Sequence, residues 1–83
     1  MKSSEVLHID VGSAILHIRD QQRKTQRRFA KELGISPVHM CRVEKGIVKA
    51  SLDLIDRVEK LTGINPYVFA WNVRNEAEKE AAK

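Results

Sequence analysis

Residues 25–46 read TQRRFAKELGISPVHMCRVEKG, and their apolar side chains recur at helical spacing on either side of a glycine. Thr25 suits the N-cap of a first helix, and Gly34 suits the left-handed residue that follows its end. Ser36 and Pro37 form an N-cap followed by proline at the first helical position, where the missing N–H costs nothing. The stretch therefore predicts two short helices joined by a sharp turn.

The second of these helices is predicted to have two chemically distinct faces. At about 100° per residue, Met40, Val43 and Glu44 fall together and should face a core. The opposite face presents an apolar group beside cations: Val38, Arg42 and Lys45. In the preceding helix, Arg27 and Lys31 likewise point away from the apolar side.

Positive charge is concentrated around this stretch. The 83 residues carry 15 Lys or Arg and 11 Asp or Glu, a formal charge of +4. Residues 19–49 hold nine Lys or Arg against three acids, whereas the segments 1–18 and 50–83 each have one more acid than base. A polyanion is the natural partner for such a patch.

Length and composition limit the alternatives. A chain of 83 residues suits one small domain, and a single cysteine excludes an internal disulfide and suits a reducing cytoplasm. There is no apolar run of about 18 residues and no basic-then-apolar leader, which argues against membrane spanning and secretion. We therefore expect a cytoplasmic protein.

Working outward from the quoted stretch, capping residues and apolar stripes predict five helices and no strand-rich segment. Asp10 caps the first, Ser51 opens the fourth, Gly63 ends it, and Asn65 caps the fifth. The expected helices cover approximately residues 11–22, 26–33, 37–45, 52–62 and 66–73. We divide the chain into an arm (1–10), a domain (11–74) and a charged tail (75–83). The segment EVLHID, residues 5–10, fits a strand, an arm or a disordered segment equally well.

The five-helix pattern resembles the Cro and phage-repressor family of helix-turn-helix proteins, over roughly residues 11–71. The quoted stretch carries the resemblance at Gln26, Phe29, Ala30, Leu33, Gly34, Ser36, Met40, Val43, Glu44 and Gly46. Flanking matches are Val11, Gly12, Ile15, Ile18, Arg19, Ser51, Leu52, Leu54, Val58, Leu61, Gly63 and Ile64. The resemblance implies an all-α, lambda-repressor-like fold of bacterial or phage type that binds double-stranded DNA and acts as a transcriptional regulator, usually a repressor.

Roles follow from the resemblance position by position. The helix starting at residue 37 corresponds to the recognition helix in the major groove, which assigns base reading to Pro37, Val38, His39 and Arg42. Gln26 matches a phosphate-binding position, and the nearby cations Arg27, Lys31, Lys45 and Lys49 would add phosphate contacts. Arg19 and Glu44 match a largely internal salt bridge. Two departures, Pro37 and Lys24, replace a side-chain hydrogen-bonder and a hydrophobe. We therefore expect sparse base readout, with phosphates supplying much of the affinity.

The fifth helix of this family often forms a dimer contact. The resemblance therefore assigns a homodimer interface to the apolar residues Val68, Phe69 and Trp71. The alternative is that Phe69 and Trp71 only cover the end of the core.

Other classes of function have less support in the sequence. The alternative is a protein-interaction module built on a helix-turn-helix domain with weak or lost DNA binding, such as an antitoxin that masks a toxin. Pro37 and Val38 favour this alternative, and the basic patch disfavours it. His39 and Cys41 lie two apart on one helix and cannot face one metal ion. No acid, base or nucleophile constellation points to an enzyme, and no cofactor is implied.

Overall fold

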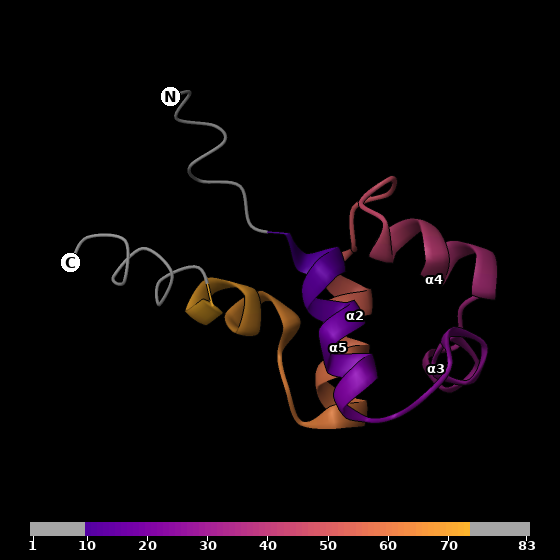
Figure 1. The fold of residues 1–83 in the computed structure, drawn as a ribbon, viewed down its shortest axis with the longest axis horizontal. Helices are drawn as coiled ribbons and strands as arrows, with labels where there is room; N and C mark the ends of the chain where they lie inside the picture. Colours follow the sequence, from indigo (N-terminus) through magenta and orange to yellow (C-terminus); the bar gives the residue numbers. More distant parts are fainter. Residues whose placement is uncertain (1–9, 74–83) are drawn as a thin grey trace.

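The computed structural model describes residues 10–73, and this part of the chain is entirely helical apart from its connections. The labelled helices are α2 (Val11–Gln21), α3 (Gln26–Leu33), α4 (Pro37–Glu44) and α5 (Leu52–Thr62), and a C-terminal helical segment covers residues 66–73 (Figure 1). The prediction of an all-α, five-helix domain is confirmed for the described residues. The predicted tail and all of the predicted arm except Asp10 lie outside the described residues.

Each helix begins where a polar side chain accepts a hydrogen bond from the backbone of the first turn, as the sequence predicted. The N-cap bonds are Asp10 to Ser13 N (2.9 Å), Thr25 to Arg28 N (3.1 Å), Ser36 to His39 N (3.1 Å), Ser51 to Leu54 N (3.1 Å) and Asn65 to Val68 N (3.1 Å). Gly34 ends α3 with φ of 77°, which side chains with a Cβ rarely adopt. Because these signals are local, the helix boundaries were readable from the sequence to within about a residue.

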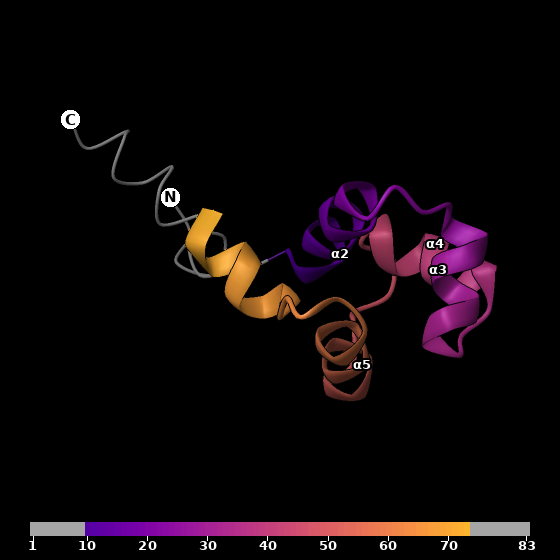
Figure 2. The same ribbon diagram turned by 90° about the horizontal axis from the view of Figure 1, so that it is seen from below.

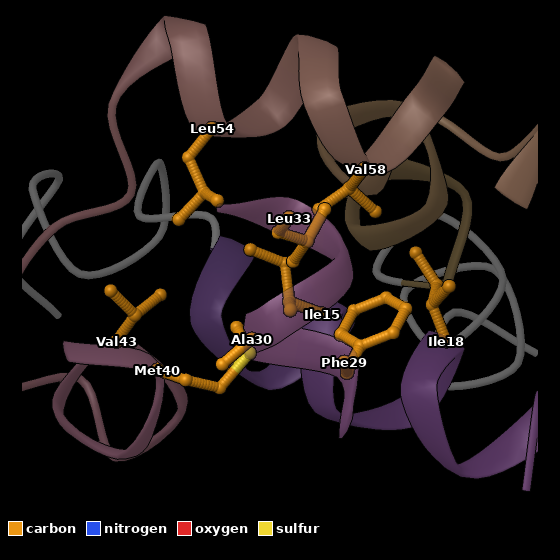
Figure 3. Packing of buried hydrophobic residues seen from close by; sticks show 9 residues of the cluster. All are labelled: Ile15, Ile18, Phe29, Ala30, Leu33, Met40, Val43, Leu54 and Val58. Atoms are coloured by element: carbon orange, nitrogen blue, oxygen red, sulfur yellow. The ribbon is translucent and has the colours of Figure 1, made fainter. Parts of the chain in front are cut away.

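The core lies where α3 and α4 meet α2 and α5. Phe29 is fully buried at its centre, with Ile18 beside it on α2 and Val58 above it on α5 (Figure 3). The buried cluster consists of Ile15, Ile18, Phe29, Ala30, Leu33, Met40, Val43, Leu54 and Val58. All four labelled helices contribute to it, so the core fixes the two helices of the quoted stretch relative to the rest of the domain.

Gly12 allows α2 and α4 to pack closely, because it has no side chain at their contact. A Cβ at Gly12 would overlap the backbone carbonyl of Val43 far inside van der Waals distance. Gly12→Ala is therefore expected to lower the free energy of unfolding by about 1–3 kcal/mol, although alanine favours helices. Urea unfolding measures this, with Ser13→Ala in the same turn as control. A rise in stability, as helix propensity alone predicts, would show that α2 can shift freely.

Candidate nucleic-acid interface

The helices α3 and α4 form one end of the domain, and the C-terminal helical segment lies at the other end of its long axis (Figures 1 and 2). The turn between α3 and α4 is closed by the Ile35 N–H, which donates to the Ala30 carbonyl at 3.0 Å. Small Ala30 is fully buried, so the two helices can pack closely. The outer surfaces of α3 and α4 are consequently presented together on a rigid support.

The exposed face of α4 contains all four residues predicted to read bases. Pro37, Val38, His39 and Arg42 are exposed, and Val38 keeps 59% of its surface accessible. On the opposite face, Met40 is fully buried. The division of α4 into an inner and an outer face is thus the one that the helical spacing predicted.

The cations of the described residues fall into two groups according to whether an acid pairs with them. Five have a carboxylate partner: Arg19 with Glu44, Lys24 and Arg28 with Glu32, Arg57 with Asp53, and Lys60 with Asp56. Among residues 10–73, the six without an ion pair are Arg23, Arg27, Lys31, Arg42, Lys45 and Lys49. All six are exposed and lie between residues 23 and 49. Their charge is therefore available to an external polyanion.

A buried network connects this surface to α2. The Arg19 guanidinium donates from Nε to Glu44 Oε2 at 2.8 Å and from Nη2 to Oε1 at 3.1 Å, and its Nη1 donates to the Lys24 carbonyl at 2.8 Å. The Glu44 side chain is only 1% exposed. The hydrogen bond to Glu44 raises the pKa of Arg19 further above its usual value, so the guanidinium stays charged. The pair locks the end of α2 to the end of α4.

Gln26 joins the same network, a contact that the sequence did not predict. Its Nε2 donates to Glu44 Oε1 at 2.7 Å. Because a carboxylate only accepts, the amide NH₂ must face Glu44, and one amide proton remains for another acceptor. The backbone N–H groups of Gln26 and Arg27, in the first turn of α3, have no acceptor among the described residues. Three N–H donors at the start of α3 are thus free for an anion.

A helix-turn-helix family matches the chain over residues 15–69, which include α3, α4, the turn between them and most of the remaining helices. The chain belongs to this family. The resemblance to the Cro and phage-repressor type is thereby confirmed, and the domain is a DNA-binding helix-turn-helix domain of a kind that is not typically enzymatic. No curated protein and no solved structure matches the chain.

Lys24, which departs from the family pattern, has a structural place in this helix-turn-helix domain. Its Nζ lies 2.7 Å from Glu32 Oε2 and 5.9 Å from the centroid of the Phe29 ring. The side chain therefore covers the edge of the core, as the usual hydrophobe would, and its charge is taken by Glu32. The hydrogen bond from Lys24, followed by that from Arg28, lowers the pKa of the Glu32 carboxyl.

Among residues 10–73, Arg23 is the one cation without an ion pair that the sequence did not predict to lie on the DNA surface. It adopts φ of 55° in the turn between α2 and α3, a region that is uncommon for residues other than glycine. Arg23 follows the C-cap of α2, and the Lys24 N–H donates to the Arg19 carbonyl at 3.3 Å, as at a helix end closed by a left-handed residue. The sequence shows no sign of this conformation, because glycine is the usual residue there. Arg23 therefore adds a cation next to the open N-terminus of α3.

The residues predicted to form a dimer contact divide into two kinds. Val68 and Trp71 are exposed, with 44% of Trp71 accessible, whereas Phe69 is partly buried and packs against the core cluster. Phe69 thus packs against the core of the helix-turn-helix domain, whereas Val68 and Trp71 leave apolar surface exposed.

The described residues also bear on whether the chain could hold a metal ion or cross a membrane. No group of three His, Cys, Asp or Glu side chains that could hold a metal ion occurs within residues 10–73. None of the described helices has the length and apolar character needed to cross a membrane.

Proposed function

We propose that the chain is a cytoplasmic, sequence-specific transcriptional repressor that binds an inverted repeat in double-stranded DNA as a homodimer. The observation that carries this proposal is the segregation of charge. Every Lys or Arg of residues 10–73 that has no acidic partner lies in the segment 23–49, around α3 and α4. Phosphate neutralisation by such cations supplies most sequence-independent affinity for DNA.

In the proposed complex, α4 enters the major groove and reads bases through its exposed face. Arg42 donates to O6 and N7 of a guanine, Val38 packs on a thymine methyl, and Pro37 and His39 contact neighbouring base edges. Because Pro37 and Val38 provide no side-chain hydrogen bond, Arg42 carries most of the direct readout. Repression follows from occupancy of the site.

Phosphate contacts surround this helix in the proposal. The free N–H groups at the start of α3 hold one phosphate, and Glu44 orients the Gln26 amide for it. The other phosphate contacts come from Arg27, Lys31, Lys45 and Lys49, with Arg23 as an addition from the structure. These contacts fix the register of the domain on the duplex and carry little base information.

The first test separates phosphate contact from charge in general. Arg27→Ala is expected to weaken binding to all DNA sequences alike and to reduce the slope of log K against log salt by about one. Arg28→Ala is the matched control, because Arg28 lies next in α3 but is paired with Glu32. Gln26→Ala should also weaken all binding, but it removes a bond to buried Glu44 as well. Loss confined to a selected site would contradict the assignment of Arg27.

The second test concerns base reading. Arg42→Ala is expected to cost about 1–3 kcal/mol of binding free energy per half-site and to relax preference at one base pair. Selection of sites from a random DNA pool, followed by titration of each single-base variant, measures both. If the variant loses affinity equally for every sequence, Arg42 contacts phosphate and another residue reads the bases.

A protein partner, such as a toxin masked by an antitoxin, is the competing proposal. The exposed apolar pair Pro37 and Val38 at the start of α4 favours it, because it supplies contact area without hydrogen-bonding groups. The unpaired cations favour DNA. A mobility-shift assay on random-sequence DNA at low and high salt distinguishes the two: absence of salt-sensitive binding would support the protein partner.

A further inference from the structure

A groove of about 320 Å³ lies where the start of α2, the connection from α4 to α5, the start of α5 and the C-terminal segment come together. This volume is at the lower end of the range for small-molecule sites. Most of the lining is apolar and includes Val11, Val43, Val48, Leu52 and Ile55. Leu52 is 85% exposed, so apolar surface of the groove is accessible from solvent.

Three side chains of the lining carry polar groups: Asp10, Lys49 and Tyr67. Lys49 and Tyr67 are exposed, and each can donate a hydrogen bond. The Asp10 carboxylate accepts from the Ser13 N–H at 2.9 Å as the N-cap of α2, and the positive end of the helix dipole offsets its charge. Lys49 has no carboxylate partner among residues 10–73. The charge that the groove offers to a ligand is therefore that of Lys49.

We infer that this groove binds a small amphipathic anion, a molecule with an apolar body and one carboxylate group. The apolar body lies along Val11, Val48 and Ile55, where its removal from water favours binding. The carboxylate accepts from the Lys49 ammonium in a charge-assisted hydrogen bond, with the Tyr67 hydroxyl as a second donor. A neutral apolar molecule would leave the Lys49 charge unused, and a cation would be repelled by it.

The groove and the DNA surface share Lys49, which gives the anion a regulatory effect. This step rests on the proposed function, in which Lys49 contacts a phosphate. The groove also borders the end of α4 at Val43 and the following residue Gly46. A carboxylate paired with Lys49 removes one phosphate contact, so the bound anion lowers the affinity for DNA. By linkage, bound DNA lowers the affinity for the anion by the same factor.

Titration of the full chain with octanoate, followed by the NMR shifts of backbone amides, tests the site without DNA. We expect saturable shifts at Val48, Ala50 and Ile55, which line the groove. Octylamine has the same chain with a positive charge, and acetate has the same charge without the chain. Each should bind at least about tenfold more weakly than octanoate, because each lacks one of the two interactions. Equal binding of octanoate and octylamine, or octanoate shifts confined to other parts of the domain, would overturn the inference.

Lys49→Met and Lys45→Met are a matched pair of variants. Each removes an exposed cation that has no ion pair among residues 10–73, but only Lys49 lines the groove. Lys49→Met should weaken octanoate binding by about twofold to fivefold, as expected for an exposed charge pair, and Lys45→Met should leave it unchanged. Asp10→Asn keeps an N-cap side chain and should strengthen octanoate binding, because it removes the only negative charge of the lining. Equal losses in the two lysine variants would show that octanoate responds to the general positive charge and not to the groove.

Competition with DNA tests whether Lys49 is shared. Octanoate should weaken DNA binding by the wild-type protein more than acetate at the same concentration, which corrects for ionic strength. The loss should approach that caused by Lys49→Met, and the Lys49→Met protein should no longer respond to octanoate. If octanoate saturates the groove and the affinity for DNA stays the same, the regulatory effect is wrong. A protein that binds octanoate in the groove but binds no DNA would instead contradict the proposed function and support the groove as an anion site.

Discussion

Arg19→Met is expected to lower the free energy of unfolding by about 3–5 kcal/mol, because it leaves a buried carboxylate without its charged partner. Glu44 is 1% exposed in its side chain and receives two of its three hydrogen bonds from Arg19. After the substitution, only the neutral amide of Gln26 remains to solvate the charge. The Lys24 carbonyl also loses its donor.

Replacement of both partners should cost far less than replacement of one. In Arg19→Met with Glu44→Leu, no charge is buried, and the apolar side chains extend the core. Urea unfolding of the two single variants and the double variant measures the difference. Lys60→Met is the control, because its pair with Asp56 is exposed and should contribute only about 0.2–1 kcal/mol. Similar small losses in all of these variants would show that the Arg19–Glu44 pair is as well solvated as a surface pair.

The Arg19–Glu44 pair also shows which contacts could be predicted from the sequence and which could not. Helical spacing placed Glu44 on the core face of α4, where an unpaired acid would be costly, and the family resemblance supplied Arg19 as its partner. The hydrogen bond from Gln26 to Glu44 could not be expected, because it depends on the distance between the start of α3 and the end of α4. That distance is set by packing around Ala30 and by the turn at Gly34, which sequence spacing does not determine.

The same distinction applies to the charged surface. Helix boundaries followed from caps such as Thr25 and Ser36, which act within one turn, and the structure reproduces them. The three-dimensional arrangement was needed to show which cations have no ion pair. Lys24, for example, pairs with Glu32, eight residues further along the chain. Arg28 and Arg27 are adjacent in sequence, yet only Arg28 is paired. The basic composition of residues 19–49 therefore predicted a patch, and the family resemblance assigned five of its six unpaired cations to the DNA surface, but Arg23 emerged only from the structure.

Trp71→Ala is expected to leave a folded monomer that binds a full operator about 10²–10⁴-fold more weakly, if the proposed homodimer forms through the C-terminal segment. Trp71 is 44% exposed and is neither in the core cluster nor among the partly buried side chains that pack against it, so its loss should leave that cluster intact. The segment lies at the end of the domain opposite α3 and α4 (Figures 1 and 2). A two-fold axis there would separate the two α4 helices, and binding of adjacent major grooves requires a separation of about 34 Å.

Phe69→Ala provides the contrast that separates association from folding. Phe69 packs against the core cluster, so its truncation should lower the stability of the monomer itself. Trp71→Ala should instead change the dissociation constant of the dimer with little change in the unfolding of the monomer. Sedimentation across a range of concentrations, combined with urea unfolding of both variants, measures these two effects independently.

DNA binding completes the test, because loss of the dimer acts only on sites that hold two subunits. The wild-type protein should bind a whole operator far more tightly than a half operator, since the second subunit binds at a high effective concentration. Trp71→Ala should bind the two DNAs with nearly equal affinity, whereas Arg42→Ala should weaken both and keep the dimer intact. A Trp71 variant that stays dimeric, or a wild-type protein that binds half operators as tightly as whole ones, would mean that the C-terminal segment only covers the core and that each domain binds DNA alone.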